Sequence, residues 1–272
     1  SKNLPFVVSL LMHQGLLHYA GSAPQSVRSE WTKIEGRFKS FQYVDDSKEI
    51  YQLISDVVSN QRRSGVVTSE EIKAHVDEAI DRKLFKGFNK TELKRLIKNA
   101  YPIHPVALYL LPRISARVAQ NERTLFSFLY SVDLNQKIFP CDLFDYFSND
   151  MRVDTTPGGT YKQWLETQSA LSKTGDAVAS QAILKTACML GLGILGERAK
   201  AGRSLLLYSL RGMDIGQDPV EAIDKLIEKK LLLYRQHNDV VSVWHGTDLD
   251  LRGRLTEEKN RTRNQFDLSH FL

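Results

Sequence analysis

Arg123 has the setting in which an arginine could contact an external anion. Apolar residues recur three or four apart through residues 101–133, with a polar break at residues 120–122. This spacing predicts two amphipathic helices and puts Arg123 in the first turn of the second one. A helix N-terminus repels cations and favours anions, so this arginine gains little from its own helix. We therefore expect its guanidinium to face an anion, with a solvated surface arginine as the alternative.

Three other polar residues have positions suited to ligand contact. His13 and Gln14 follow residues 6–12, a continuous apolar run of strand length that is typical of a strand buried on both faces of a parallel sheet. The carboxyl end of such a strand is where α/β sheets place ligand-contacting groups, although His13 could simply cap the strand. Arg37 lies in a loop after a short predicted helix, where it could reach a neighbouring molecule or form a structural salt bridge.

The elements that position these residues are mostly helices. Capping signals and apolar spacing stay helical for about ninety residues after Asp46. Ser47 can cap the first of these helices, residues 68–71 fit a capping box, and Asn89 can cap a third. Together with the two helices of residues 101–133 they predict a compact helical subdomain.

The last third of the chain predicts a different arrangement. A short aromatic helix over residues 140–147 precedes a linker at residues 151–161, where proline and glycine break regular structure. Helices are predicted over residues 161–171, 182–195, 204–210 and 219–230, the last with proline at its first position. Two short strands, residues 231–236 and 240–245, then form a β-hairpin. Three helices followed by a hairpin is the order of a winged helix, whose residues 219–230 could enter a DNA groove.

Basic residues in this part could contact phosphates. They are Arg198, Lys200, Arg203, Lys225, Lys229, Lys230 and Arg235. Acidic residues on and around the candidate recognition helix dilute that charge, and winged helices also serve purely as protein contacts. The acids are Glu197, Asp218, Glu221, Asp224 and Glu228. The sequence therefore leaves DNA contact and protein contact open.

Composition sets broad limits. The 272 residues are enough for one large domain or two or three small ones, and a hydrophobic content of 42% is ordinary for globular proteins. No window is apolar enough to cross a bilayer, so we expect a cytoplasmic protein with no membrane partner. Cys141 and Cys188 lie far apart without metal-ligand spacing, which predicts free buried thiols. A net charge of +5 permits nucleic-acid binding without requiring it.

Familiar catalytic motifs give little support for an independent enzyme. Residues 191–196 match GxGxxG by letter, but they close a predicted helix instead of following a strand. The sequence contains no GxxxxGK(S/T) phosphate loop, no predicted strand ending in paired acids, no nucleophile elbow and no HExxH. The chain as given thus lacks the parts that bind and activate a nucleotide phosphate.

Five segments carry a resemblance to a known family. They are LPFVVSLLMHQ, WTKIEGRFKSF, YPIHPVALYLLPRISARVAQNERTLFSFL, the stretch ending LLLYRQHNDVVSVW, and HGTDLDLRGRL. In their order these segments resemble the second half of an AAA+ ATPase of the origin-recognition and STAND-like branch. They are most similar to the large bacterial ATPases of phage-defence islands, of the BREX type.

The resemblance implies a mainly α protein with four parts. Residues 1–46 would be the end of an α/β ATPase core, 47–150 a helical lid, 151–246 a winged helix and 247–272 a helical tail. It also implies ATP and Mg²⁺, bound mainly by residues outside this chain. His13 or Gln14 would be the sensor-1 residue and Arg123 the sensor-2 arginine that contacts the γ-phosphate. Arg37 would be the arginine finger that reaches the nucleotide of the next subunit in a homo-oligomer.

Three functions remain after these observations. The first is an AAA+ portion that couples nucleotide state to DNA or to a DNA-bound assembly, in phage defence. The second is a non-enzymatic winged-helix module that binds DNA or acts as an adaptor. The third is a structural helical scaffold in which Arg37 and Arg123 are ordinary surface residues.

Overall fold

The computed structural model describes residues 24–35, 37, 48–61, 67–119, 122–155, 159–194 and 201–244. Within these residues the chain is mainly helical, as the sequence predicts, and its regular β-structure is limited to two short strands. Among the described helices, none has both the length and the apolar character needed to span a bilayer. His13, Gln14 and the strand predicted before them lie outside the described residues.

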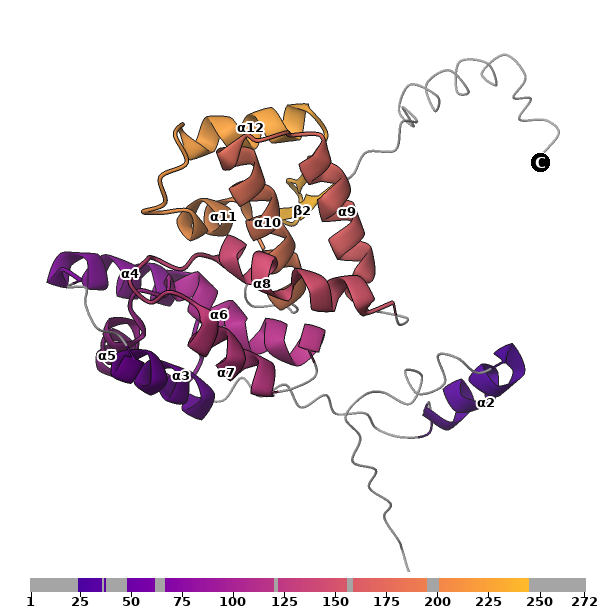
Figure 1. The fold of residues 1–272 in the computed structure, drawn as a ribbon, viewed down its shortest axis with the longest axis horizontal. Coiled ribbons are helices and arrows are strands. Elements are labelled where there is room, and N and C mark those ends of the chain that lie inside the picture. Colours follow the sequence, from indigo (N-terminus) through magenta and orange to yellow (C-terminus); the bar gives the residue numbers. More distant parts are fainter. Residues whose placement is uncertain are drawn as a thin grey trace, which may run out of the picture.

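Three capped helices form the first group, and Figure 1 shows them side by side in indigo and purple. They are α3 (Lys48–Gln61), α4 (Ser69–Asp81) and α5 (Lys90–Ala100). Asn89 caps α5 as predicted, and here it also forms a reciprocal pair that the sequence predicts only for residues 68–71: its side chain accepts from the backbone N–H of Glu92, and Glu92 accepts from that of Asn89. Thr68 caps α4 by accepting from the N–H of Glu71, whose carboxylate binds Lys137.

The helix α6 (Pro105–Ile114) runs through the interior and is buried on almost every side. Pro112 has no N–H to bond to the carbonyl one turn earlier, and three residues later the chain becomes the π-helix η1 (Ser115–Ala119). A second helix, α7 (Glu122–Ser131), follows. The two predicted helices are present, and the break predicted between them falls mostly on residues 120–121, which lie outside the described residues.

The remaining elements complete the described part of the chain. They are α8 (Pro140–Val153), α9 (Tyr161–Ser172), α10 (Val178–Gly193), α11 (Arg203–Ser209), α12 (Pro219–Glu228), β1 (Leu232–Arg235) and β2 (Val240–Val243). The strands pair antiparallel as the predicted hairpin, with Leu232 opposite Val243 and Arg235 opposite Val240. Helix α8 is longer than the sequence predicts, since it continues to Val153 before Asp154 ends it.

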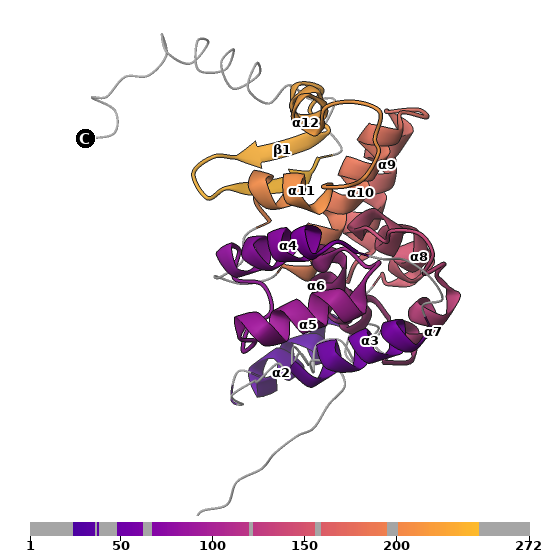
Figure 2. The ribbon, with the colours of Figure 1, turned by 90° about the vertical axis from the view of Figure 1, so that its left-hand side faces the viewer.

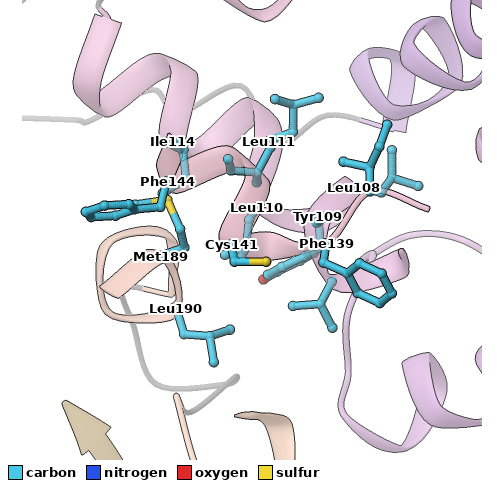
Figure 3. Packing of buried hydrophobic residues seen from close by; sticks show 14 of the residues in the cluster. Leu108, Tyr109, Leu110, Leu111, Ile114, Phe139, Cys141, Phe144, Met189 and Leu190 are labelled. Carbon is cyan, nitrogen blue, oxygen red and sulfur yellow. The ribbon is translucent and has the colours of Figure 1, made fainter. Parts of the chain in front are cut away.

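One continuous hydrophobic core joins the first helices to the last ones. Helix α10 lies at its centre and contacts α6, α8, α9, α11, α12 and β2. Figure 3 shows Met189 and Leu190 of α10 beside Leu110 and Ile114 of α6 and Phe144 of α8. Figure 2 shows the hairpin and α12 stacked on one side of α4 and α6, with α3 and α5 on the other. We call α11, α12 and the two strands the hairpin unit. The first group of helices (α3, α4 and α5) and the hairpin unit are therefore packed together in the described structure.

Helix α2 (Gln25–Glu35) lies apart from this assembly in Figure 1. It is the short helix that the sequence predicts before Arg37. The division of the chain into four parts, with boundaries after residues 46, 150 and 246, stays a prediction.

Candidate functional site

Arg37 follows α2 in a turn and is exposed, and its backbone N–H donates to the carbonyl of Ile34 at 3.0 Å. The exposed setting agrees with the sequence, and the role of an arginine finger stays a prediction. Arg123 is the second residue of α7, in the first turn as the spacing predicts. Its side chain lies outside the described part, so its contact with an anion also stays a prediction. Figures 1 and 2 show α2 and α7 well separated.

Two arginines that the sequence did not single out are used to end helix α10. Arg117 Nη1 donates to the carbonyl of Leu192 at 2.9 Å, and Arg113 Nη1 donates to that of Gly193 at 3.4 Å. The last carbonyls of a helix have no partner within the helix and carry partial negative charge, so cations are favourable there. These guanidinium groups therefore have a structural explanation.

The GxGxxG letters also have a structural explanation. Gly191 and Gly193 lie in the last turn of α10, as the sequence predicts, and not between a strand and a helix. A Cβ on Gly193 would lie 2.5 Å from Leu110 Cδ2 and 3.3 Å from Ile114 Cδ1. Glycine at this position thus permits the close approach of α10 to α6.

Of the seven predicted phosphate-contacting residues, Arg198 and Lys200 lie outside the described residues, and the other five fall into two groups. Arg203 Nη2 pairs with Asp224 Oδ1 at 2.7 Å, and Lys225 Nζ lies 3.8 Å from Glu221 Oε2. The charges of Arg203 and Lys225 are therefore partly neutralised by acidic residues of α12. Lys229 and Lys230 at the end of α12, and Arg235 at the end of β1, are exposed, and no ion pair to another described residue is seen for them.

The hairpin is held against the start of α11 by polar contacts. Asp239 Oδ1 accepts from the backbone N–H of Arg203 at 3.3 Å and from the hydroxyl of Tyr234 at 3.2 Å. The N–H of Val241 donates to the carbonyl of Ala201 at 2.8 Å. A Cβ on Gly202 would meet the Asp239 carboxylate at 2.4 Å, so only glycine lets the turn approach this closely. The turn of the hairpin therefore has a defined place beside α11.

A cluster of aromatic and imidazole rings joins α4, α6 and α11, and sequence reasoning missed it. Nδ1 of His75 lies 2.9 Å from the hydroxyl of Tyr208. The ring of His104 lies 5.3 Å from that of His75 and 5.0 Å from that of Tyr208, and it stacks on Phe139 at 5.7 Å. We call His75, His104 and Tyr208 the ring cluster.

Burial changes the ionisation of all three members of the ring cluster. It is the largest cause that lowers the pKa of His75, and Arg211 and Lys137 lower it as well, against Glu71 and Glu78. Burial also lowers the pKa of His104 to well below its usual value, assisted by His75, Lys137 and Arg211. The backbone of Tyr208 is the weakest influence and opposes this shift, although no bond of ordinary hydrogen-bond geometry reaches Nε2 of His104 from the described residues. The pKa of the Tyr208 hydroxyl is raised, chiefly by burial.

Charged side chains surround the ring cluster in pairs. Glu78 binds Arg82 one turn later on the chain and also Arg211, at 2.8 Å. The guanidinium of Arg82 lies 4.9 Å from the ring of Tyr208, and that of Arg211 lies 5.6 Å from it, in cation–π arrangements. Lys137 Nζ pairs with Glu71 Oε1 at 2.7 Å. The acids near the ring cluster are thus already paired with cations.

A polar pocket of about 280 Å³ lies between α3 and α5. Its polar lining includes Gln52, Asp56, Arg95 and Asn99, with Phe88 as an apolar wall. Its position between two helices that face away from α12 separates it from the predicted phosphate contacts. The volume approaches that of small-ligand sites.

The described residues contain no group of three or more His, Cys, Asp or Glu side chains that could hold a metal ion. Cys141 and Cys188 are buried free thiols, as the sequence predicts, and burial raises the pKa of each to about 12. Both cysteines are therefore protonated and unreactive in ordinary conditions.

Comparison with known proteins found no family model, no curated protein and no solved structure that matches this chain.

Proposed function

We propose that this chain is the lid and winged-helix portion of an AAA+ ATPase, which couples the state of bound ATP to contact with DNA or with a partner protein. The observation that carries the proposal is the sequence of elements in the last third. Helices α10, α11 and α12 are followed at once by an antiparallel hairpin, and α10 contacts α11, α12 and β2. That order is the one expected of a winged helix. A role in phage defence rests on the resemblance to BREX-type ATPases alone.

The nucleotide part of the proposal depends on arginines. Phosphoryl transfer to water needs little covalent help, so catalysis rests on cations placed where negative charge grows. In this proposal Arg123, in the first turn of α7, contacts the γ-phosphate, and Arg37 reaches the nucleotide of the next subunit of a homo-oligomer. His13 or Gln14 would be the polar residue of the sensor-1 strand. ATP and Mg²⁺ would be held mainly by residues outside this chain.

The residues encoded before Ser1 provide the test of the nucleotide part. We expect a GxxxxGK(S/T) loop after a strand, roughly 100–250 residues upstream, which is the usual reach of one α/β domain. In the protein that contains this loop, Arg123→Ala should lower kcat for ATP by about 10²–10³-fold, as loss of a transition-state contact does. Arg152→Ala, on an exposed position of α8, is the control and should leave kcat unchanged. No upstream loop, or an unchanged kcat in Arg123→Ala, would contradict the proposal.

A second candidate function is a non-enzymatic adaptor, and the charges of α12 favour it. The stretch from the N-cap Asp218 to Glu228 has four acids and one lysine, and that lysine lies within 4 Å of Glu221. A helix that reads DNA faces phosphates on both sides of the groove, so a net negative helix is poorly suited to enter it. The three exposed cations at the end of α12 and on β1 remain suited to phosphate contact.

The salt dependence of DNA binding separates these two functions. For a duplex probe measured by fluorescence anisotropy, phosphate contact predicts affinity that falls steeply with added salt. The triple variant K229E/K230E/R235E should then weaken binding and flatten the salt dependence, by about one unit of log–log slope per lost contact. The matched control is K86E/K94E/K98E, which makes the same charge change at exposed positions in and before α5. Absence of binding at about 50 mM salt would instead favour the adaptor.

A further inference from the structure

We propose that the contact of α11 with α4 and with the N-terminus of α6 is a proton-sensitive junction, closed while His75 and His104 are neutral and opened when they take up protons. In the ring cluster α4, α6 and α11 meet through titratable side chains whose rings contact one another. Opening would release the hairpin unit from the first helices. The inference stands independently of nucleotide or DNA binding.

The position of His104 makes its neutral form part of the fold. Nδ1 of His104 accepts from the backbone N–H of Val106 at 3.2 Å and so caps the N-terminus of α6. Because Nδ1 accepts, the neutral ring carries its proton on Nε2. An added proton must therefore go to Nδ1, where it removes the cap. The resulting cation would also face the positive end of the α6 dipole, where cations are unfavourable.

The surroundings of His104 offer little compensation for a charge, since the backbone of Tyr208 is the weakest of the influences on its pKa. The side chain is only 6% exposed, and its Nε2 makes no hydrogen bond with the described residues. The adjoining cavity, lined by His75, His104, Lys137 and Arg211 among others, measures about 20 Å³. That volume has room for about one water molecule, so solvent cannot hydrate an imidazolium there unless the junction opens.

His75 meets the same obstacle from its charged neighbours. The groups that face it are Glu71 and Glu78 of α4, Arg82 at the end of α4, Lys137 before α8, Tyr208 of α11 and Arg211 after α11. Both acids already hold cations, since Glu71 pairs with Lys137 and Glu78 pairs with Arg82 and Arg211. A third positive group beside them would compete with these pairs. The Tyr208 hydroxyl can still accept from a protonated ring, so desolvation and repulsion are the main costs.

The direction of the pH effect follows from proton linkage. Both histidines have lowered pKa values in the closed state, so the opened state binds more protons at acidic pH. The junction is fully stable above the ordinary histidine pKa of about 6.5 and loses stability as the pH falls below it, down to the lowered values. Within that window each histidine can raise the opening equilibrium constant by at most about tenfold per pH unit.

Hydrogen exchange of the 272-residue chain between pH 7.5 and 5.5, corrected for the intrinsic rate, measures this opening. Over residues 203–243 we expect the opening constant to rise about tenfold or more, while α5 changes little. His75→Gln retains a polar group near Tyr208, and His104→Asn retains a helix cap, so each should reduce the pH dependence without abolishing the junction. His237→Gln, at an exposed position in the hairpin turn, is the control and should keep the wild-type dependence.

Three results would contradict the proposal of a proton-sensitive junction. One is an opening constant over residues 203–243 that does not change with pH. Another is a rise shared equally by α5, which would mean global unfolding. The third is an unchanged dependence in both His75→Gln and His104→Asn. If either variant does not fold, NMR titration of the wild-type histidines decides, because midpoints of His75 and His104 at or above 6.5 would contradict the proposal.

Discussion

Helices α6 and α12 are both ten residues long and both begin with proline, yet they use their surfaces in opposite ways. In α6 nine of the ten residues are buried, and Arg113, the exception, is turned to the end of α10. In α12 only Ala222, Ile223 and Leu226 are buried, and its charged residues remain on the surface. The first helix is an interior element and the second is a surface element attached by one face.

The difference teaches where function can be sought in this fold. Substitutions in α6 should act on stability, because almost every side chain there has packed neighbours. Substitutions on the outer face of α12 should leave stability nearly unchanged, and in the proposed function they act on binding. The basic charge of the chain follows the same division, since Arg113 and Arg117 bind carbonyls of α10 while Lys229 and Lys230 stay exposed.

The largest effect that would test this comparison is expected at Leu110. The side chain is fully buried in α6 and contacts the end of α10. Leu110→Ala should lower the free energy of unfolding by about 2–5 kcal/mol, because it removes buried methyl groups and leaves a cavity. Urea denaturation followed by circular dichroism measures the change. A loss below about 1 kcal/mol would show that α6 is not the interior element described above.

Gly193 provides a second test of the contact between α6 and α10. A Cβ there would lie 2.5 Å from Leu110 Cδ2, so Gly193→Ala in the wild type should cost about 1–3 kcal/mol through overpacking. In the Leu110→Ala background the same methyl group enters the space that the leucine left, and Gly193→Ala should become neutral or stabilising. The double-mutant cycle measures this coupling. Additive effects would mean that the two helices do not meet at these residues.

Local signals explain why much of the fold could be predicted. The cap at Asn89, the proline at the start of α12 and the hairpin depend on residues within a few positions of one another. The end of α8 was missed because proline and glycine at residues 157–159 suggested an earlier linker. Asp154 instead ends the helix and closes the following loop by accepting from the N–H and hydroxyl of Thr160, at 2.7 and 3.1 Å.

The ring cluster could not be predicted in the same way. His75 and Tyr208 are 133 residues apart, and no local pattern links them before the helices pack. His104 could have been noticed as a capping residue, because it directly precedes Pro105 at the first position of α6. The pairing of Arg203 with Asp224 could not be predicted either, because it forms only when α11 and α12 come together in the folded protein. Long-range polar contacts of this kind need the fold before they can be inferred.

The smallest expected changes in the free energy of unfolding come from removing single charges, one half-buried at the end of α10 and one exposed on α12. Arg117 is half-buried and donates to the carbonyl of Leu192, so Arg117→Ala leaves that carbonyl without its charged donor and should cost about 1.5–3 kcal/mol. Lys225 is exposed on α12 and lies 3.8 Å from Glu221, so Lys225→Ala should change the free energy of unfolding by less than about 0.5 kcal/mol.

Salt separates these two substitutions further. The Lys225–Glu221 pair is exposed on both sides, so whatever it contributes should disappear as the salt concentration approaches about 1 M, where screening acts within about 3 Å. The Arg117 contact is partly withdrawn from solvent and directed at a helix end, and its contribution should persist in most part. Thermal unfolding of both variants at low and high salt measures the difference. Equal costs for the two variants at both salt concentrations would mean that burial does not distinguish the charges of α12 from those that end α10, and the comparison of the two helices would fail.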